Sequence, residues 1–456
     1  MSARVYSEDD LVQWLETTGR TPRPEYVDSL LARTARSRQR SAWRFPERWL
    51  PVDITARAPA FSGRRVPVRM LAVVALVVLA IAAATLYVGS QRRLPAPFGP
   101  AGNGVIVYAA PEDGAWMKSN AYQRPIGDIL TVNPATADTS VLVGGPTEDG
   151  YPVVSLDGTR VAFVRETDEG QALYVIDITG GTPRPLTTNP VEEIDDAAWS
   201  PDGASVAFVA TEGDQSSLWI ARADGGDAHR IELESKLSFA LPQWRPPDGE
   251  ELLLVGSPSS AEVLLPQYDY RDIFGHYEEP TAVGTGLYLV HPDGSDLRQI
   301  TPATGTFHDY GLVSWTPDGE RILTHTADPA DPNHYARVRV LDPDGTVVRT
   351  IEPTSGDETT GAIVSPDGSR IAYADLREPG SWTIRVAPVD GSSDPLDTGA
   401  RFAGQAAVFR WSPDGTQLIV THQYYKETWL FDVDGGPGRR ATWTDPGSNV
   451  WQRVAP

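Results

Sequence analysis

The sequence of 456 residues contains no cysteine. The chain therefore has no disulfide bond, no zinc site built on thiolates and no cysteine nucleophile. The sequence also lacks the G-x-S-x-G nucleophile elbow, the P-loop, and a dinucleotide-binding glycine pattern placed between a strand and a helix. We therefore expect no cofactor, and no α/β hydrolase domain after the repeats described below.

Basic residues are scarce in the larger part of the chain. Residues 1–99 hold 15 of the 39 basic and 8 of the 61 acidic residues, a net charge of +7, which leaves −29 for residues 100–456. A body this acidic repels phosphate backbones. The charge argues against nucleic-acid binding by this part and is compatible with cationic ligands or with solubility alone.

One long uncharged run lies in the N-terminal part. Residues 70–88 are 19 consecutive residues without a charged side chain, and as a helix they would extend roughly 28 Å, enough for the hydrocarbon core of a bilayer. A signal peptide does not normally follow about seventy residues of polar chain. We predict one transmembrane helix within residues 66–90.

Arginines flank this run unequally. Arg64, Arg65 and Arg69 precede it closely, while Arg92 and Arg93 follow it. Further upstream, residues 33–48 alone carry six arginines: Arg33, Arg36, Arg38, Arg40, Arg44 and Arg48. The positive-inside rule then predicts a single-pass cell-membrane protein with its N-terminus in the cytoplasm and residues 104–456 outside it. Residues 91–103, which are rich in proline and glycine, are predicted to form a linker between the helix and the outer part.

The cytoplasmic segment, residues 1–65, is predicted to hold two short helices. Ser7 and Asp10 have the spacing of a capping box before Leu11, and helical spacing resumes at Glu25 after a break at residues 19–24. The layout is similar to the cytoplasmic part of some anti-sigma factors, without the His and Cys residues of their zinc-binding class. The basic run either binds anionic lipid, docks a protein such as a sigma factor, or only sets the topology.

Residues 104–456 are dominated by a repeat of the form Ser-Pro-Asp-Gly, followed each time by a strand-like stretch. Proline presets a turn, aspartate satisfies local backbone donors, and glycine permits a positive φ, while the β-branched and aromatic residues that follow suit a strand. Repetition in every copy indicates that the Asp-Gly pairs form structural turns and not a catalytic site. The pairs are Asp157 and Gly158, Asp202 and Gly203, Asp248 and Gly249, Asp318 and Gly319, Asp367 and Gly368, and Asp414 and Gly415.

The spacing of the repeat predicts the fold. The repeat glycines are 45, 46, 70, 49 and 47 residues apart, and most of these steps suit one four-stranded blade of a β-propeller. The repeats resemble the WSPDG repeats of TolB-like, WD40-like (PD40) propellers, with Trp199, Trp244, Trp315 and Trp411 in the aromatic position. The resemblance implies an all-β propeller over residues 104–456. It implies no single function, because such propellers serve as binding scaffolds, peptidase lids and enzyme platforms.

The number of blades depends on the two ends of the repeat region. Residues 104–143 look like the later strands of a unit that lacks its opening strand, and residues 450–456 look like that missing strand. We expect the C-terminal strand to complete the first blade and close the ring. Seven blades result, and six blades are the alternative.

The 70-residue step locates an insertion at about residues 257–286, in a loop between the second and third strands of a blade. If such loops share a face with the loops that lead into the next blade, five of the seven histidines lie toward that face. These residues either form a rim that binds a divalent metal or a small polar ligand, or are solvated loop residues without a common centre, since their spacing matches no metal motif. The candidate ligand-binding residues are His276, Tyr277, His308, Asp309, His325, His334 and His422.

Three functions are consistent with these features. The leading hypothesis is a non-enzymatic, membrane-anchored module that binds a protein or a small ligand on the face of the propeller. The alternative is a transmembrane regulator, similar to an anti-sigma factor, whose propeller senses the exterior. A hydrolase or lyase acting from the face that bears the insertion ranks last.

Overall fold

The computed structural model describes residues 97–110, 126–213, 215–226, 228–233, 235, 237–257, 286–301, 313–327, 336–354, 358–378, 381–403, 408–422, 427–441, 443 and 450–455. The chain divides into two units, Met1–Ser90 and Gln91–Pro456, and all of these residues lie in the second. The predicted cytoplasmic segment and transmembrane helix, residues 1–65 and 66–90, fall outside them. Within the described ranges, no helix combines the length and apolar character that a membrane crossing requires.

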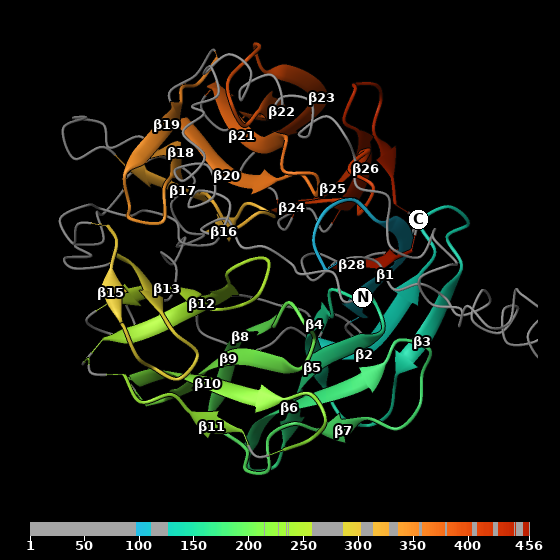
Figure 1. The fold of residues 1–456 in the computed structure, drawn as a ribbon. Helices are drawn as coiled ribbons and strands as arrows, with labels where there is room; N and C mark the ends of the chain where they lie inside the picture. The colour runs from blue at the N-terminus through green and yellow to red at the C-terminus, as the bar shows by residue number, and fades with distance from the viewer. Residues whose placement is uncertain are drawn as a thin grey trace, which may run out of the picture. The chain divides into compact units, whose positions relative to one another are not determined.

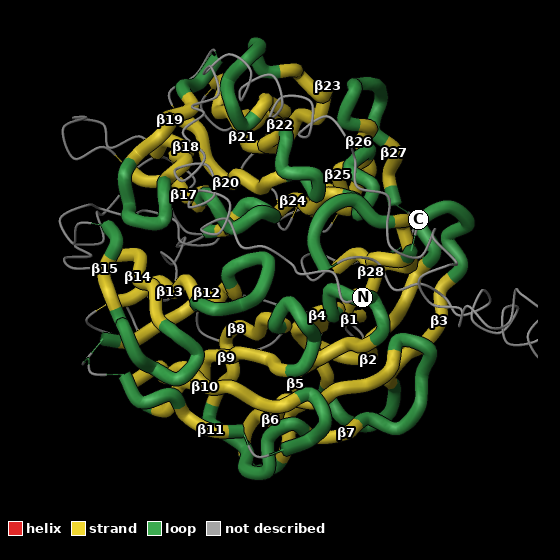
Figure 2. Tube along the Cα trace, in the orientation of Figure 1, coloured by secondary structure: helices red, strands yellow, loops and turns green. Residues whose placement is uncertain are grey.

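The described residues form strands and loops and contain no helix (Figure 2). The largest sheet has eight strands. These are β1 (Gly102–Ala110), β2 (Ile126–Val132), β3 (Thr139–Val143), β4 (Asp149–Val154), β5 (Arg160–Thr167), β6 (Gly170–Asp177), β7 (Arg184–Pro185) and β28 (Val450–Val454). They follow the order β28-β1-β2-β4-β5-β6-β7, and β3 pairs with β2.

The other described strands form five four-stranded sheets, each made of four strands that follow one another in the chain. The first three sheets contain β8 (Glu193–Trp199), β9 (Ser205–Glu212), β10 (Gln215–Arg222) and β11 (His229–Arg230); β12 (Ser238–Trp244), β13 (Leu252–Ser257), β14 (Gly286–Val290) and β15 (Arg298–Gln299); and β16 (Ser314–Trp315), β17 (Ile322–Ala327), β18 (Ala336–Leu341) and β19 (Val347–Ile351). The last two contain β20 (Glu358–Val364), β21 (Arg370–Glu378), β22 (Ser381–Pro388) and β23 (Leu396–Ala403); and β24 (Val408–Trp411), β25 (Gln417–His422), β26 (Glu427–Asp432) and β27 (Arg439–Arg440). Successive sheets follow one another around a common centre, as in a β-propeller (Figure 1).

The repeat turn joins the first and second strands of a sheet, and its side chains hold it together. In the copy after β8, the Ser200 hydroxyl donates to Asp202 Oδ1 at 2.6 Å, and the Ala204 amide donates to the same oxygen at 2.9 Å. Gly203 has a φ of 67°, which a side chain would strain. The copy at Asp248 lacks the hydroxyl, and there the Gly249 amide donates to the Arg245 carbonyl at 2.9 Å. The turn therefore depends on local bonds that the sequence pattern already specifies.

Each sheet buries apolar side chains against the sheets before and after it. Phe208 of β9 packs against β5 and β6 of the preceding sheet, and within the eight-stranded sheet Phe163 of β5 packs against Val107 and Ile129 of β1 and β2. These side chains alternate along their strands, so one strand contributes to two junctions. Full burial of a side chain of this size contributes roughly 1.5–3 kcal/mol.

The two ends of the chain meet in one sheet. As the sequence predicted, the C-terminal strand β28 joins the first strands of the repeat region: it pairs antiparallel with β1. In this register Trp451 stands opposite Ile106. Trp451 and Ile106 then pack on Ile419 and Leu430 of the last sheet. The β28 side chain Gln452 also reaches the turn after β4, donating from Nε2 to the Gly158 carbonyl at 2.8 Å. The closing strand thus contacts both the last sheet and the turn between β4 and β5.

The two ends of each sheet differ, and we name them for what they carry. The turn end carries the repeat Asp-Gly turns. The loop end is the opposite end, where second strands finish and third strands begin, as at the facing pairs Gly256 and Gly286, and Ala327 and Ala336. Ser257 and Gly286 are the strand residues between which the predicted insertion lies, so this insertion starts and finishes at the loop end.

Replacing Trp451 with alanine should lower the free energy of unfolding by about 3–5 kcal/mol. The indole is 7% exposed, and its Nε1 donates to the Gly104 carbonyl at 3.2 Å, so its loss opens the closing junction. Urea denaturation measures the change. The matched control is Val348→Ala on the outer strand β19, where a side chain that is 50% exposed should change the stability by less than about 0.5 kcal/mol. Equal losses in the two variants would contradict the closing role of β28.

The repeat turns predict a pH dependence of stability. The Ser200 hydroxyl, followed by the Ala204 amide, holds the pKa of Asp202 below its ordinary value of 3.8. A carboxylate whose pKa is lower in the folded state than in the unfolded state stabilises the fold at any pH above its unfolded-state pKa. This stabilisation is lost as the pH falls through the folded-state pKa. Thermal melts from pH 7 to pH 3 of Asp202→Asn should therefore show a shallower loss of Tm below about pH 4 than the native chain. Asp168→Asn, at an exposed position between β5 and β6, should leave the profile unchanged.

Candidate functional site

Two of the seven candidate ligand residues lie within the described strands. His422 is the last residue of β25 and stands opposite Glu427 in the register of β26. His325 lies in β17, and its side chain is 2% exposed. The other five, His276, Tyr277, His308, Asp309 and His334, lie outside the described residues. Both placed histidines are at the loop end, but the sheet β20–β23 separates their strands, so the described structure does not bring them together.

His325 faces a buried polar group on the neighbouring sheet that sequence reasoning missed. Its strand neighbour Leu323 packs against Tyr373 of β21, and strand alternation points His325 to the same junction. Beyond Tyr373, Asp375 accepts a 2.5 Å bond from Nε of Arg385, with side-chain exposures of 0% and 7%. Burial raises the pKa of Tyr373 to about 12. The phenol is therefore neutral at physiological pH.

A second buried ion pair lies at the loop end of β4 and β5, in the eight-stranded sheet. Arg165 of β5 donates from Nε and Nη2 to the two oxygens of Asp149, at 2.7 and 2.9 Å. Its guanidinium lies 4.8 Å from the centre of the Tyr174 ring. Burial raises the pKa of the Asp149 carboxyl, and the hydrogen bonds from Arg165 oppose that rise. Each of these acids is committed to an arginine, which makes the pairs structural groups and not free acids or bases.

Arg165 and Asp375 occupy equivalent positions, seven residues after their repeat glycines. The second repeat has alanine at this position, Ala210, and its side chain is buried in the apolar cluster of its junction. A charged residue where the strand pattern calls for an apolar one is the signal that could have revealed both pairs. The same signal does not identify the partners. The partner of Arg165 is Asp149 on β4, the strand before it, whereas the partner of Asp375 is Arg385 on β22, the strand after it.

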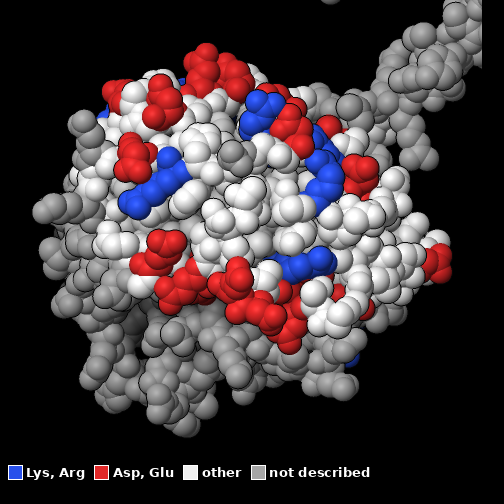
Figure 3. Space-filling view, turned by 90° about the horizontal axis from the view of Figure 1, so that it is seen from below, with Lys and Arg blue, Asp and Glu red and all other residues white. Residues whose placement is uncertain are grey.

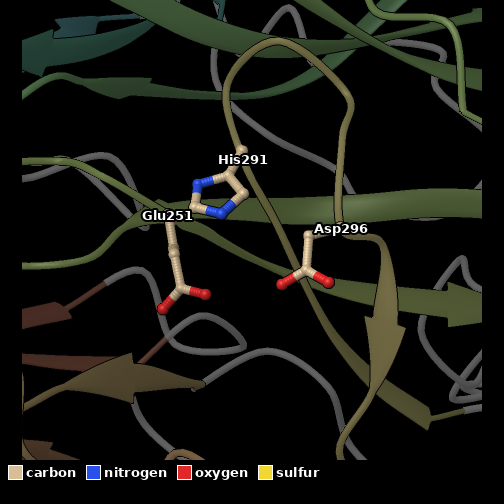
Figure 4. A group of neighbouring side chains, drawn as sticks. All are labelled: Glu251, His291 and Asp296. Atoms are coloured by element: carbon tan, nitrogen blue, oxygen red, sulfur yellow. The ribbon is translucent and has the colours of Figure 1, made fainter.

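A third group brings carboxylates and a histidine together at the turn end (Figure 4). Glu251 precedes β13, His291 follows β14, and Asp296 precedes β15 with a φ of 54°. One side-chain ligand atom from each lies within 4.8 Å of the others. His291 Nδ1 lies 2.8 Å from the Glu250 carbonyl, so in the tautomer that donates there its Nε2 is an acceptor. The residue types and distances alone would suit a divalent metal.

Two arginines occupy the oxygens that a metal would need. Arg245 Nη1 lies 2.5 Å from Glu251 Oε2, and Arg298 donates to Glu251 Oε1 and, at 2.8 Å, to Asp296 Oδ2. Burial by itself would raise the pKa of Glu251, but the bonds from Arg298 and Arg245 hold it below its ordinary value. Two carboxylates and two guanidiniums leave no net negative charge to attract a cation. We interpret the group as an ion-pair network.

The network belongs to a contact that recurs between sheets. Arg160 donates to the carbonyl of the next repeat glycine, Gly203, at 2.6 Å and lies 4.9 Å from the ring centre of Trp199. Arg370 makes the same pair of contacts with the next sheet, to Gly415 and Trp411, and Arg245 makes them to Gly319 and Trp315. In the sheet β12–β15, Glu251 and Arg298 position Arg245 for this role.

The family comparison agrees with the fold. Residues 115–269, about a third of the chain, match the family model described as the TolB beta propeller domain, PD40. TolB-like propeller repeats are therefore present in this chain, as the Ser-Pro-Asp-Gly pattern predicted.

The curated relatives share only parts of their length with the chain. It is 26% identical over 224 residues to the uncharacterized peptidase YuxL of Bacillus subtilis, covering 43% of this chain and 33% of the relative. It is 36% identical over 76 residues to the Tol-Pal system protein TolB of Sodalis glossinidius, covering 16% of this chain and 17% of that protein. The chain thus spans about a third of YuxL and about a sixth of TolB.

Solved structures show the same fold at low identity. The oligogalacturonate lyase of Vibrio parahaemolyticus is 13% identical, with a TM-score of 0.51, over 74% of this chain and 86% of that one. At this identity the likeness shows the fold alone. The described part of the chain is all-β and of the propeller type, with TolB-like repeats.

Replacing Glu251 with glutamine should lower the free energy of unfolding by about 1–3 kcal/mol, because Arg245 and Arg298 lose their shared charge partner. Zinc, manganese and calcium should produce no saturable rise in Tm in the native chain, since the arginines already neutralise the carboxylates. Thermal-shift titration measures both effects. A saturable rise with any of the three metals that disappears in Glu251→Gln would show that the group is a metal centre.

Proposed function

We propose that this protein is a membrane-anchored binding scaffold. In this proposal a helix within residues 66–90 anchors a seven-bladed propeller outside the cytoplasm, and the loop end of the propeller binds a protein partner or a small ligand without catalysis. The uncharged run and its flanking arginines support the anchor and its orientation. The TolB-like repeats support the binding role.

The strand pairing supports seven blades. Within the eight-stranded sheet, β2 and β4 pair only at Ile126 with Gly150 and Gly127 with Asp149. By contrast, β4 and β5 pair along four positions, and β1 and β2 along five. The eight strands therefore divide into a blade of β28, β1, β2 and β3 and a blade of β4 to β7. With the five four-stranded sheets, seven blades result, and an apolar cluster lies at each of seven junctions among the described residues.

The observation that carries the proposal is the difference between the two ends of the blades. At the turn end, short turns are closed by their own side chains and are tied to the next blade by Arg160, Arg245 and Arg370. At the loop end, the buried acids Asp149 and Asp375 are bound by arginines of their own sheets. A rigid frame whose acids are paired suits the presentation of loops to a partner better than general acid–base chemistry.

The described surface offers no extended basic face in the view of Figure 3. Acidic side chains gather there in a row beside the residues drawn in grey and in smaller groups elsewhere, and the basic side chains form separate small patches. Together with the charge of −29 on residues 100–456, this pattern supports a partner other than nucleic acid. We propose a protein or a small molecule as the partner at the loop end.

Protease digestion of intact cells tests the anchoring. A C-terminal tag on the full-length protein should be removed from outside, an N-terminal tag should be protected, and deletion of residues 66–90 should release the protein from the membrane fraction.

Crosslinking of the full-length protein, compared with crosslinking of a form that lacks residues 1–65, then shows which part of the chain binds each partner. Those retained by the shortened form belong to the propeller, and a sigma factor lost with the segment would favour the alternative of a transmembrane regulator. In the protease experiment, removal of the N-terminal tag with protection of the C-terminal tag would contradict the proposed topology.

A further inference from the structure

Two side-chain bonds join strand β1 to the last repeat turn. Asn103 of β1 donates from Nδ2 to Asp414 Oδ2 at 2.8 Å, and Asn103 Oδ1 accepts from the Asp414 amide at 3.0 Å. Beside them, the Ala101 amide donates to the Pro413 carbonyl at 2.9 Å. We call the pair of bonds between Asn103 and Asp414 the closing clasp, because it links the last sheet to the strand with which β28 pairs.

The closing clasp stands where other junctions have an arginine contact. Arg160 and Arg370 each lie two residues after a repeat glycine, and each donates to a carbonyl of the next sheet. Gln417 holds the same place in the last repeat, but its Nε2 donates to Asp432 of its own sheet at 2.8 Å. The last repeat therefore reaches the first strands through Asp414 and not through a guanidinium.

The two oxygens of Asp414 have different donors. Oδ1 accepts from the Ser412 hydroxyl at 2.6 Å and from the Thr416 amide at 3.0 Å, while Oδ2 accepts from Asn103. Burial by itself would raise the pKa of Asp414, but the bonds from Ser412, Thr416 and Asn103 hold it below its ordinary value. At physiological pH the closing clasp therefore joins a neutral amide to a carboxylate ion.

Asn103 is exposed and is followed by glycine at an irregular point of its strand. Two residues of β1, Gly104 and Val105, stand opposite the single residue Gln452 of β28, which makes a β-bulge. Inside the bulge, the Val105 amide donates to the side-chain oxygen Oε1 of Gln452 at 3.2 Å. Glycine lacks a Cβ, so the Gly104 nitrogen is more easily approached, and its backbone rotates more freely, than at any other residue type.

We propose that Asn103 is a deamidation site that the closed ring protects. In this reaction the Gly104 nitrogen loses its proton and bonds to Cγ of Asn103, while the bond from Cγ to Nδ2 breaks and ammonia leaves. Water then opens the cyclic imide and leaves an aspartate or an isoaspartate. The closing clasp holds the Asn103 amide against Asp414, so the attack requires the clasp to open first.

The reaction product cannot form the closing clasp again. A carboxylate at residue 103 has no hydrogen to donate to Asp414 and carries the same charge. Deamidation therefore weakens the closure permanently once the ring has opened. The inference adds a modification site to the propeller and does not depend on the proposed anchoring or partner.

Peptide mass spectrometry of the full-length protein, incubated at mildly alkaline pH, tests the site. We expect slow conversion of Asn103 in the folded native chain and faster conversion in urea, where the closing clasp is absent. Asp414→Asn removes the charged acceptor of the clasp and should speed the conversion in the folded protein about threefold to tenfold. Asn133 and Asn189 precede proline, whose nitrogen has no proton to lose, so both should stay intact.

The matched control for Asp414→Asn is Asp367→Asn. Asp367 accepts from the Ser365 hydroxyl in the preceding repeat turn, as Asp414 does from Ser412, so the change weakens an equivalent turn and leaves the closing clasp in place. Its rate of conversion at Asn103 should match that of the native chain. Equal rates in Asp414→Asn and the native chain, or equal acceleration by Asp367→Asn, would overturn the protective role of the clasp. Absence of conversion at Asn103 in Asp414→Asn would overturn the site itself.

Thermal melts test the effect of deamidation on the ring. Asn103→Asp places the charge of the product beside Asp414 and should lower Tm by about 2–4 °C relative to the native chain. Asn103→Ala loses the two bonds of the closing clasp without adding a charge, so it should lower Tm less. Arg453 stands opposite Asn103 in the register of β28, but its Nη2 already donates to the Gly99 carbonyl at 2.8 Å. An unchanged or higher Tm in Asn103→Asp would show that Arg453 neutralises the new charge, and would overturn the weakening of the closure.

Discussion

A four-stranded sheet with two apolar faces is not stable alone, and every feature of this propeller follows from the need to cover both faces. Val206 and Phe208 of β9 pack on the preceding sheet, while Ala207 of the same strand packs on the following one. Alternation along a strand makes each sheet dependent on two neighbours. A row of such sheets would leave one apolar face exposed at each end, so the row must close into a ring. Strand β28 provides the closure, because it places the last residues of the chain beside β1.

The contacts between sheets depend on properties of arginine that lysine lacks. The sequence contains 36 arginines and 3 lysines. A planar guanidinium can donate to a carbonyl and at the same time lie over an indole ring, as Arg160 does with Gly203 and Trp199. An ammonium group is a compact point charge and does not combine these two contacts in one plane. The same planarity lets Arg165 bind both oxygens of Asp149.

Much of the fold could be predicted because the repeat turns depend on interactions between residues that are adjacent in the sequence. Residues such as Ser200, Asp202 and Gly203 form their turn through bonds to one another and to adjacent amides. The closing strand was predictable because residues 104–143 lack an opening strand and residues 450–456 supply one. The polar groups were not predictable in the same way. The pairing of Asp375 with Arg385 depends on strand register, and that of Glu251 with Arg298 depends on how two turns approach each other.

The sequence by itself determined the all-β class, the repeat, the turns and the candidate span, because each depends on residue types at short spacing. Of the candidate ligand residues, the described structure places His325 in a buried junction and His422 at a strand end, two sheets apart, and their role stays a prediction. Only the tertiary structure decided which charges are already neutralised and which donors are left without acceptors. The reason is that Trp199 and Trp315 hold the same place in the repeat, and only the neighbouring sheet determines whether a carbonyl meets the indole.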